Sequence, residues 1–78
     1  MDLDTRLKRV MADVFGISTE KIGENASIDT VSEWDSLNSM NLAVSLEDEF
    51  NVQFTDEELM DMLNYKIIRM TLMEKGIE

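Results

Sequence analysis

The sequence predicts an all-α fold, a small four-helix bundle with three main helices and one short helix. Apolar residues recur at three- and four-residue steps in three segments, residues 3–15, 36–50 and 66–75. A helix-capping motif starts a short fourth segment at residues 56–62. The chain has 78 residues, 44% of them hydrophobic, which fits one small domain with one core. We therefore expect a single domain over residues 1–78, with a long ordered loop at residues 16–34.

The first predicted helix, residues 3–15, has one apolar stripe. Its members are Leu3, Leu7, Val10, Met11, Val14 and Phe15. Asp2 or Asp4 can cap its start, and Gly16 can end it in the left-handed conformation. The stripe predicts that one face of this helix packs on the core.

The loop at residues 16–34 shows no sustained periodicity and is rich in Gly, Asn, Ser and Asp. Loops of this length in a small domain are usually functional or disordered. Apolar residues recur along it, and we expect them to anchor it in the core; they are Ile17, Ile22, Ile28 and Val31. These anchors favour an ordered loop.

The second predicted helix begins at Asp35 and Ser36, runs to about Phe50 and has two apolar rows. Leu42, Leu46 and Phe50 form one row, and Leu37, Met40 and Val44 form another on the side of Ser36. One row is enough to bury a helix in a small bundle, so the second is available to a partner. The alternative is that both rows pack inward, as in a central bundle helix.

The last two helices are predicted from a capping box and a second apolar stripe. Thr55 and Glu58 have the spacing of a capping box that starts a short helix over residues 56–62. We expect Asn64 to interrupt the helical path. The last helix, about residues 66–75, is expected to direct its apolar side chains toward the core and to stop near Gly76; these side chains are Ile67, Ile68, Met70, Leu72 and Met73.

The chain is strongly acidic, with 17 Asp and Glu against 7 Lys and Arg and a net charge of −10. Residues 22–65 contain eleven acidic residues and no Lys or Arg. Such a surface repels phosphate backbones, which excludes nucleic-acid binding through a basic patch. It also attracts basic partners, although a merely solvated acidic surface is the alternative. Because no long apolar run or basic leader is present, we expect a cytoplasmic protein without a membrane span.

The absence of Cys and His removes most catalytic and metal chemistry. It excludes disulfides, thiolate or imidazole metal sites and triads with an imidazole base. An EF-hand loop counted from Asp29 fails, because Trp34 replaces the required Gly and Met40 the required Glu. An enzyme that used Ser36 would need a lysine base, and the nearest are Lys21 and Lys66. We expect no catalytic residue and no metal site, with at most weak cation binding at residues 47–49 and 56–58.

The triplet Asp35-Ser36-Leu37 at the start of the second helix is the candidate site. Asp and Ser are preferred helix N-caps, so a purely structural role is one interpretation. The other is that the Ser36 hydroxyl carries a group. A phosphoryl group attached there would be stabilised by the helix dipole.

This triplet, followed by Leu42 and by Leu46-Glu47-Asp48-Glu49-Phe50, resembles the Asp-Ser-Leu helix of acyl carrier proteins. The resemblance extends over nearly the whole chain. It implies that a phosphopantetheinyl transferase attaches 4′-phosphopantetheine from coenzyme A to Ser36, with Asp35 part of the surface that the transferase recognises. It also implies that the thiol of this arm holds acyl intermediates as thioesters in fatty-acid, polyketide or related biosynthesis.

The resemblance further implies that the second helix docks on basic patches of acyl-transferring and acyl-modifying enzymes. The apolar contacts would be Leu37, Met40 and Val44, the acidic contacts Glu47 and Asp48, and the lining of an acyl pocket Leu42, Leu46 and Phe50. We expect a monomer.

The chain departs from common fatty-acid carriers near Ser36. Asn38 and Asn41 stand where those carriers usually have acids, and Trp34 stands where a small residue is commoner. Fewer charges beside Ser36 weaken electrostatic docking, which favours a specialised carrier over a housekeeping one. An aminoacyl or peptidyl carrier, or an acidic helical adaptor without a cofactor, remains the alternative.

Overall fold

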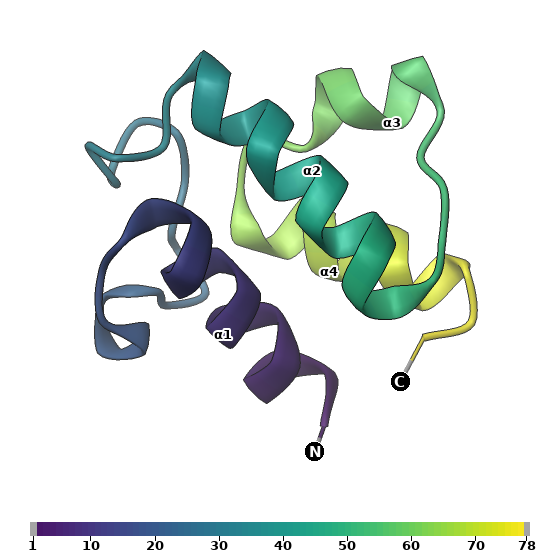
Figure 1. Cartoon of the computed structure of the whole chain (residues 1–78), viewed down its shortest axis with the longest axis horizontal. Coiled ribbons are helices and arrows are strands. Elements are labelled where there is room, and N and C mark those ends of the chain that lie inside the picture. The colour runs from purple at the N-terminus through teal and green to yellow at the C-terminus, as the bar shows by residue number, and fades with distance from the viewer. Residues whose placement is uncertain (1, 78) are drawn as a thin grey trace.

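The computed structural model describes residues 2–77 as a bundle of helices (Figure 1). In chain order they are α1 (Leu3–Phe15), the short 3₁₀ helix η1 (Thr19–Lys21), α2 (Ser36–Phe50), α3 (Asp56–Asp61) and α4 (Tyr65–Glu74). Within these residues there is no β-strand, only an isolated antiparallel bridge between Ser27 and Asn64. The predicted all-α class, with three main helices and a short one, is confirmed.

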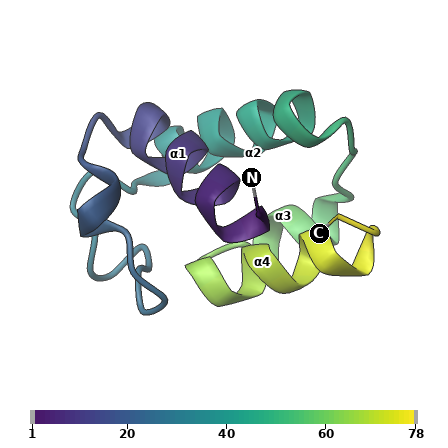
Figure 2. The same cartoon turned by 90° about the horizontal axis from the view of Figure 1, so that it is seen from below.

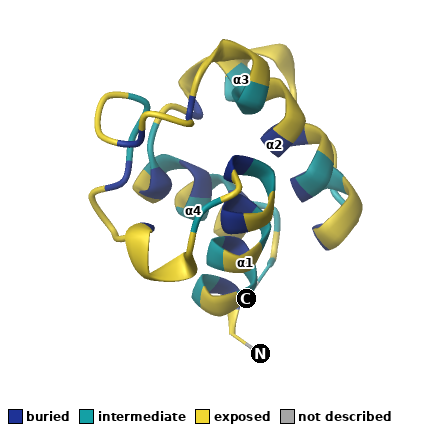
Figure 3. Cartoon of the chain, turned by 60° about the vertical axis from the view of Figure 1, so that its left-hand side comes forward, coloured by how far each residue is buried: buried dark blue, intermediate teal, exposed yellow. Residues whose placement is uncertain are grey.

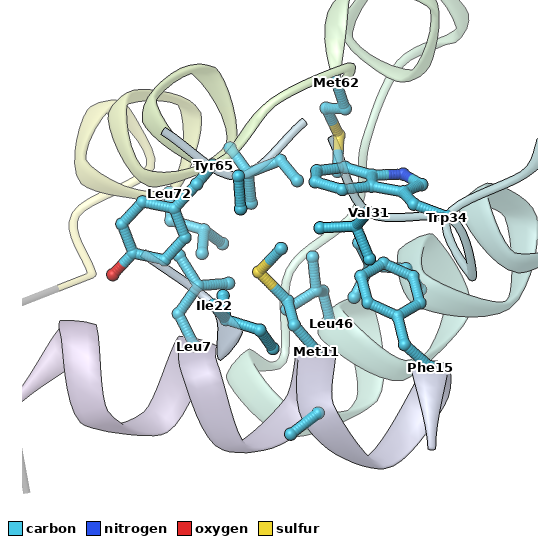
Figure 4. Packing of buried hydrophobic residues seen from close by; sticks show 14 of the residues in the cluster. Leu7, Met11, Phe15, Ile22, Val31, Trp34, Leu46, Met62, Tyr65 and Leu72 are labelled. Carbon is cyan, nitrogen blue, oxygen red and sulfur yellow. The ribbon is translucent and has the colours of Figure 1, made fainter. Parts of the chain in front are cut away.

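The helices enclose one core. α1 packs along α2, and α4 lies on the opposite side of the bundle from α2 (Figure 2). Figure 4 shows the packing: Phe15 and Trp34 meet at one end, and Leu7, Tyr65 and Leu72 lie at the other. The most completely buried large side chains come from every long helix and from the loop; they are Leu7, Met11, Ile22, Trp34, Leu42, Leu46, Tyr65, Ile68 and Leu72.

Side-chain caps set the starts of the two longest helices at the predicted residues. Asp2, not Asp4, caps α1, with its carboxylate accepting from the Thr5 amide at 2.8 Å. Gly16 ends α1 with φ 69°, a left-handed conformation that glycine adopts without strain. Asn51 ends α2 in the same way, with φ 55°.

The loop between α1 and α2 is anchored as predicted by Ile22 and Val31, which are buried. Ile17 and Ile28 are only partly buried and pack at the edge of the core. The loop also supplies Trp34, which is 1% exposed and which the sequence pattern did not assign to the core. The loop is therefore held at its end as well as along its length.

The predicted inward face of α4 is wrong at two methionines and at Ile67, which is only partly buried and lies outside the core cluster. Met70 and Met73 are 58% and 50% exposed, whereas Ile68 and Leu72 are fully buried. As predicted, Asn64 lies in the break between the last two helices, since α3 ends at Asp61 and α4 begins at Tyr65. Asn64 also caps α4, with its Oδ1 accepting from the Ile67 amide at 2.9 Å. Tyr65 thereby becomes the first member of the buried stripe. A stripe at positions i, i+3 and i+7 turns the two methionines away from the core.

Tyr65 also ties α4 to α1 through a small polar network. Its hydroxyl donates to Asp4 Oδ1 at 2.5 Å, and Arg69 Nε donates to the same oxygen at 2.8 Å. The hydrogen bond from Tyr65, and to a smaller extent the one from Arg69, lowers the pKa of the Asp4 carboxyl. Burial, and then the hydrogen bond to Asp4, raise the pKa of the Tyr65 phenol above its ordinary value of 10.0.

This network predicts a pH dependence at both ends of the scale. The lowered pKa of Asp4 adds stability above the ordinary carboxyl range, and this stability is lost as the pH falls through that range. The raised pKa of Tyr65 adds stability that is lost as the pH rises above 10.0. Because Tyr65 is the only tyrosine, the ultraviolet absorbance of tyrosinate follows it alone. We expect it to ionise at higher pH in the folded chain than in urea.

Tyr65→Phe is the matched variant for this network. It keeps the ring and removes the hydrogen bond, so we expect a loss of about 1 kcal/mol of unfolding free energy at neutral pH. The loss should shrink in acid, where Asp4 is protonated. If Tyr65 ionised at the same pH in the folded chain and in urea, this would contradict the interaction between Tyr65 and Asp4.

Candidate functional site

The Ser36 side chain is exposed at the first turn of α2. The preceding residue, Asp35, is the N-cap, and its Oδ1 accepts from the Asn38 amide at 2.8 Å. Among residues 2–77, no side chain or backbone group is hydrogen-bonded to the Ser36 hydroxyl. Asp35 therefore supplies the helix cap, and the Ser36 hydroxyl remains available.

Two asparagines and a tryptophan brace the chain on both sides of Ser36. Asn38 Nδ2 donates to the Glu33 carbonyl at 2.8 Å, and Asn41 Nδ2 donates to Asn38 Oδ1 at 3.2 Å. Trp34 Nε1 donates to Ser39 Oγ at 3.0 Å. Sequence reasoning read the asparagines only as missing charges. The feature that could have revealed this contact is that Asn38 is the third residue of α2, a position from which a side chain can reach back over the helix start.

The electrostatics of this turn fit an attached phosphodiester. The first turn of α2 contains no acidic residue, because Asn38 occupies the third position. The free amides at the helix start and the helix dipole favour an anionic group there. Ser36 thus offers an unbonded hydroxyl at a helix end that stabilises negative charge.

The two apolar rows of α2 face opposite environments. Leu37, Met40 and Val44 are 71%, 63% and 62% exposed. The row Leu42, Leu46 and Phe50 is buried in the core. The alternative in which both rows pack inward is wrong, and Figure 3 shows both buried and exposed segments on α2. The exposed row lies on the side of Ser36, while the expected pocket row is close-packed core.

The two predicted docking acids differ in their surroundings. Asp48 is exposed and its carboxylate forms no hydrogen bond or ion pair with another residue of the described chain. Glu47 is partly buried, and its Oε2 accepts from the Phe54 amide at 3.0 Å. The structure thus gives Glu47 a role in holding the chain after α2, which sequence reasoning missed.

In the part of the chain that the structure describes, three ion pairs neutralise part of the acidic surface. They join Arg6 to Glu49 at 3.2 Å, Arg69 to Asp4 at 2.8 Å and Lys75 to Glu58 at 2.9 Å. Within residues 2–77, no group of three or more carboxylates is arranged to hold a metal ion. In the same range, no helix is long and apolar enough to cross a bilayer.

The remaining charge repulsion predicts a dependence of stability on salt. We expect the melting temperature to rise on addition of moderate NaCl, because screening weakens repulsion among the acids of residues 22–65. Millimolar Mg²⁺ or Ca²⁺ should act in the same direction. Melting followed by circular dichroism measures the effect, and a curve insensitive to all three salts would show that the acids are locally compensated.

Comparisons with known proteins agree with this site. The family described as "Phosphopantetheine attachment site" matches residues 5–64, a range that contains Ser36. The chain is 34% identical over 56 residues to an acyl carrier protein of Sinorhizobium fredii, covering 72% of each chain. It has the same identity and coverage with the acyl carrier protein AcpP of Rhizobium meliloti.

Proposed function

This chain belongs to the acyl carrier protein family, whose prosthetic group is covalent 4′-phosphopantetheine, and we propose that Ser36 carries this group. The observation that supports Ser36 is its exposed, unbonded hydroxyl at the start of α2, where Asp35 already supplies the cap. The terminal thiol of the arm supplies thioester chemistry. The chain's own residues hold the attachment point and present it to enzymes, and we propose no catalytic role for them.

Attachment exchanges the phosphoanhydride bond of coenzyme A for a phosphate ester on Ser36. The Ser36 oxygen attacks the pyrophosphate phosphorus that bears the pantetheine of coenzyme A, and the bond from that phosphorus to the 3′,5′-ADP leaving group breaks. The serine proton is taken up by the transferase or by solvent. Asp35 lies beside this oxygen, and we propose that its carboxylate forms part of what the transferase recognises.

The exposed face of α2 is proposed as the docking surface for partner enzymes. Leu37, Met40 and Val44 supply apolar contact beside Ser36, and Asp48 supplies a carboxylate for a basic patch. Glu47 contributes less, because the Phe54 amide already uses one of its oxygens. We propose a cytoplasmic monomer that meets these enzymes in turn.

The proposed pocket row is closed to solvent in the structure. Leu42, Leu46 and Phe50 are 1%, 0% and 5% exposed and belong to the core. Sheltering of an acyl chain would require this row to separate from its neighbours. We propose the row as the place where a bound chain would enter.

The pathway is proposed from the residues around Ser36. Asn38 and Asn41 brace the helix start instead of adding charge, so docking on strongly basic patches is weaker here than with acids at these positions. This supports a specialised acyl or polyketide carrier. An aminoacyl or peptidyl carrier has the same attachment chemistry and differs in the enzyme that loads it.

The test is the intact mass of the protein after incubation with coenzyme A, Mg²⁺ and a broad-specificity phosphopantetheinyl transferase. We expect one phosphopantetheinyl group per chain, located by fragmentation on the peptide that contains Ser36. A folded chain that gains no group with this transferase or with that of its native host would refute the carrier function and favour an adaptor. Acylation assays of the loaded chain then distinguish acyl from aminoacyl cargo.

A further inference from the structure

A hollow lies between α1 and α2, outside the row Leu37, Met40 and Val44. It has a volume of about 350 Å³ and is lined by Val10, Asp13, Val14, Ser45, Asp48 and Glu49. A second hollow shares Asp13, Val14 and Ser45 with it and reaches Asn41 and Val44 on α2. We refer to the two together as the α1–α2 groove.

The groove is continuous with the exposed face of α2. Residues four apart lie in one row along a helix, so Leu37, Asn41 and Ser45 form one row. Met40, Val44 and Asp48 form another. Both rows begin with an exposed apolar residue near Ser36 and end in the groove. A protein that docks along these rows therefore meets α1 as well as α2.

The groove combines apolar surface with two unpartnered carboxylates from different helices. Neither Asp13 nor Asp48 forms a side-chain hydrogen bond or ion pair with another residue in the range 2–77. Glu49, which also lines the groove, already forms an ion pair with Arg6 at 3.2 Å. Val14 is partly buried and Val44 is 62% exposed. A lysine or arginine matches this surface, because its aliphatic stem can cover valines while its head stays charged.

We propose that the α1–α2 groove receives a basic amphipathic helical segment of a partner protein, with a lysine or arginine head at Asp13 and Asp48. This inference rests on the proposed function, because it extends the docking face of α2. It makes α1 part of the docking surface. Asp13, which lies outside the acidic segment 22–65, is then a specificity-determining residue for the partner.

The test is a titration of the ¹⁵N-labelled chain with a synthetic amphipathic helical peptide of leucine and lysine. We expect amide shift changes at Asp13, Val14, Ser45 and Asp48. Asp13→Asn should weaken binding about two- to five-fold, the range of an exposed ion pair. The matched control is Asp61→Asn, which removes an exposed carboxylate from the hollow between α3 and α4 and should leave the affinity unchanged. High salt should abolish the difference.

Two results would overturn the proposal that the groove binds a basic helical segment. One is equal weakening by Asp13→Asn and Asp61→Asn, which would show that the peptide senses only net charge. The other is a set of shift changes that leaves out Asp13 and Val14. Loading of Asp13→Asn with phosphopantetheine separates the two proposals: a loaded variant with unchanged peptide affinity refutes the groove alone, whereas an unloaded wild type refutes the carrier function.

Discussion

We expect Ser36→Ala to gain no phosphopantetheine under conditions that load the wild-type chain completely. The reason is chemical, because alanine has no oxygen to form the phosphate ester. Ser32→Ala is the matched control: it removes another exposed hydroxyl, four residues earlier, whose only described bond is to Glu33 Oε1 at 3.0 Å. Intact mass should show one added group on Ser32→Ala and none on Ser36→Ala.

The fold should survive the loss of Ser36, so the result reports chemistry rather than unfolding. The Ser36 side chain is exposed and makes no hydrogen bond with the described chain, while the Asp35 cap and the Asn38 brace stay in place. Surface substitutions of this kind usually change stability by less than about 0.5 kcal/mol. Melting curves of both variants provide the check. A group that still attaches to Ser36→Ala would place the site at another hydroxyl.

The sequence predicted α1 and α2 well, because both have a regular apolar stripe and a strong capping residue. Asp2 and Asp35 satisfy the first free amides of their helices, and Gly16 needs only its own conformational freedom to end α1. These are local effects, which the order of residues specifies directly. The candidate site was proposed from a local signal as well, the helix start at Ser36.

What the sequence did not predict depends on contacts between distant segments. The break at Asn64 was predicted, but the sequence pattern did not show that its side chain also caps α4, or that Tyr65, which follows, bonds to Asp4 on α1. Met70 and Met73 are apolar, but the rotation of α4 set by Tyr65 places them outside. Neither the Glu47 bond to the Phe54 amide nor the brace at Asn38 follows from periodicity, since each joins a helix to an irregular segment.

Trp34→Ala is expected to cost about 3–5 kcal/mol of unfolding free energy, as truncation of a large core side chain does. The Trp34 side chain is 1% exposed, and its ring centroid lies 5.2 Å from that of Phe15 on α1. A domain of this size has only about 5–15 kcal/mol of stability in total. The variant should therefore unfold at a far lower urea concentration than the wild type. Unfolding is followed by far-ultraviolet circular dichroism, because the substitution removes the only tryptophan and so rules out tryptophan fluorescence.

Two conservative variants separate packing from the hydrogen bond of Trp34. Trp34→Phe keeps an aromatic ring against Phe15 but loses the bond to Ser39, and Ser39→Ala loses that bond and keeps the ring. Ser39→Ala should cost about 1 kcal/mol, and Trp34→Phe more than that but less than Trp34→Ala. If Trp34→Ala were no less stable than Ser39→Ala, the ring would not anchor the loop.

The position of Trp34 joins this stability effect to the proposed function. It is two residues before Ser36, so its packing on Phe15 and its bond to Ser39 fix the chain that enters α2. At a temperature where Trp34→Ala remains folded, we expect slower phosphopantetheine loading than for wild type, because the transferase must then order the segment around Asp35 and Ser36 as it binds. Time courses of intact mass measure the rate. An unchanged rate in the folded variant would show that Asp35 and the Asn38 brace are sufficient to present the serine, and that Trp34 contributes to the stability of the bundle alone.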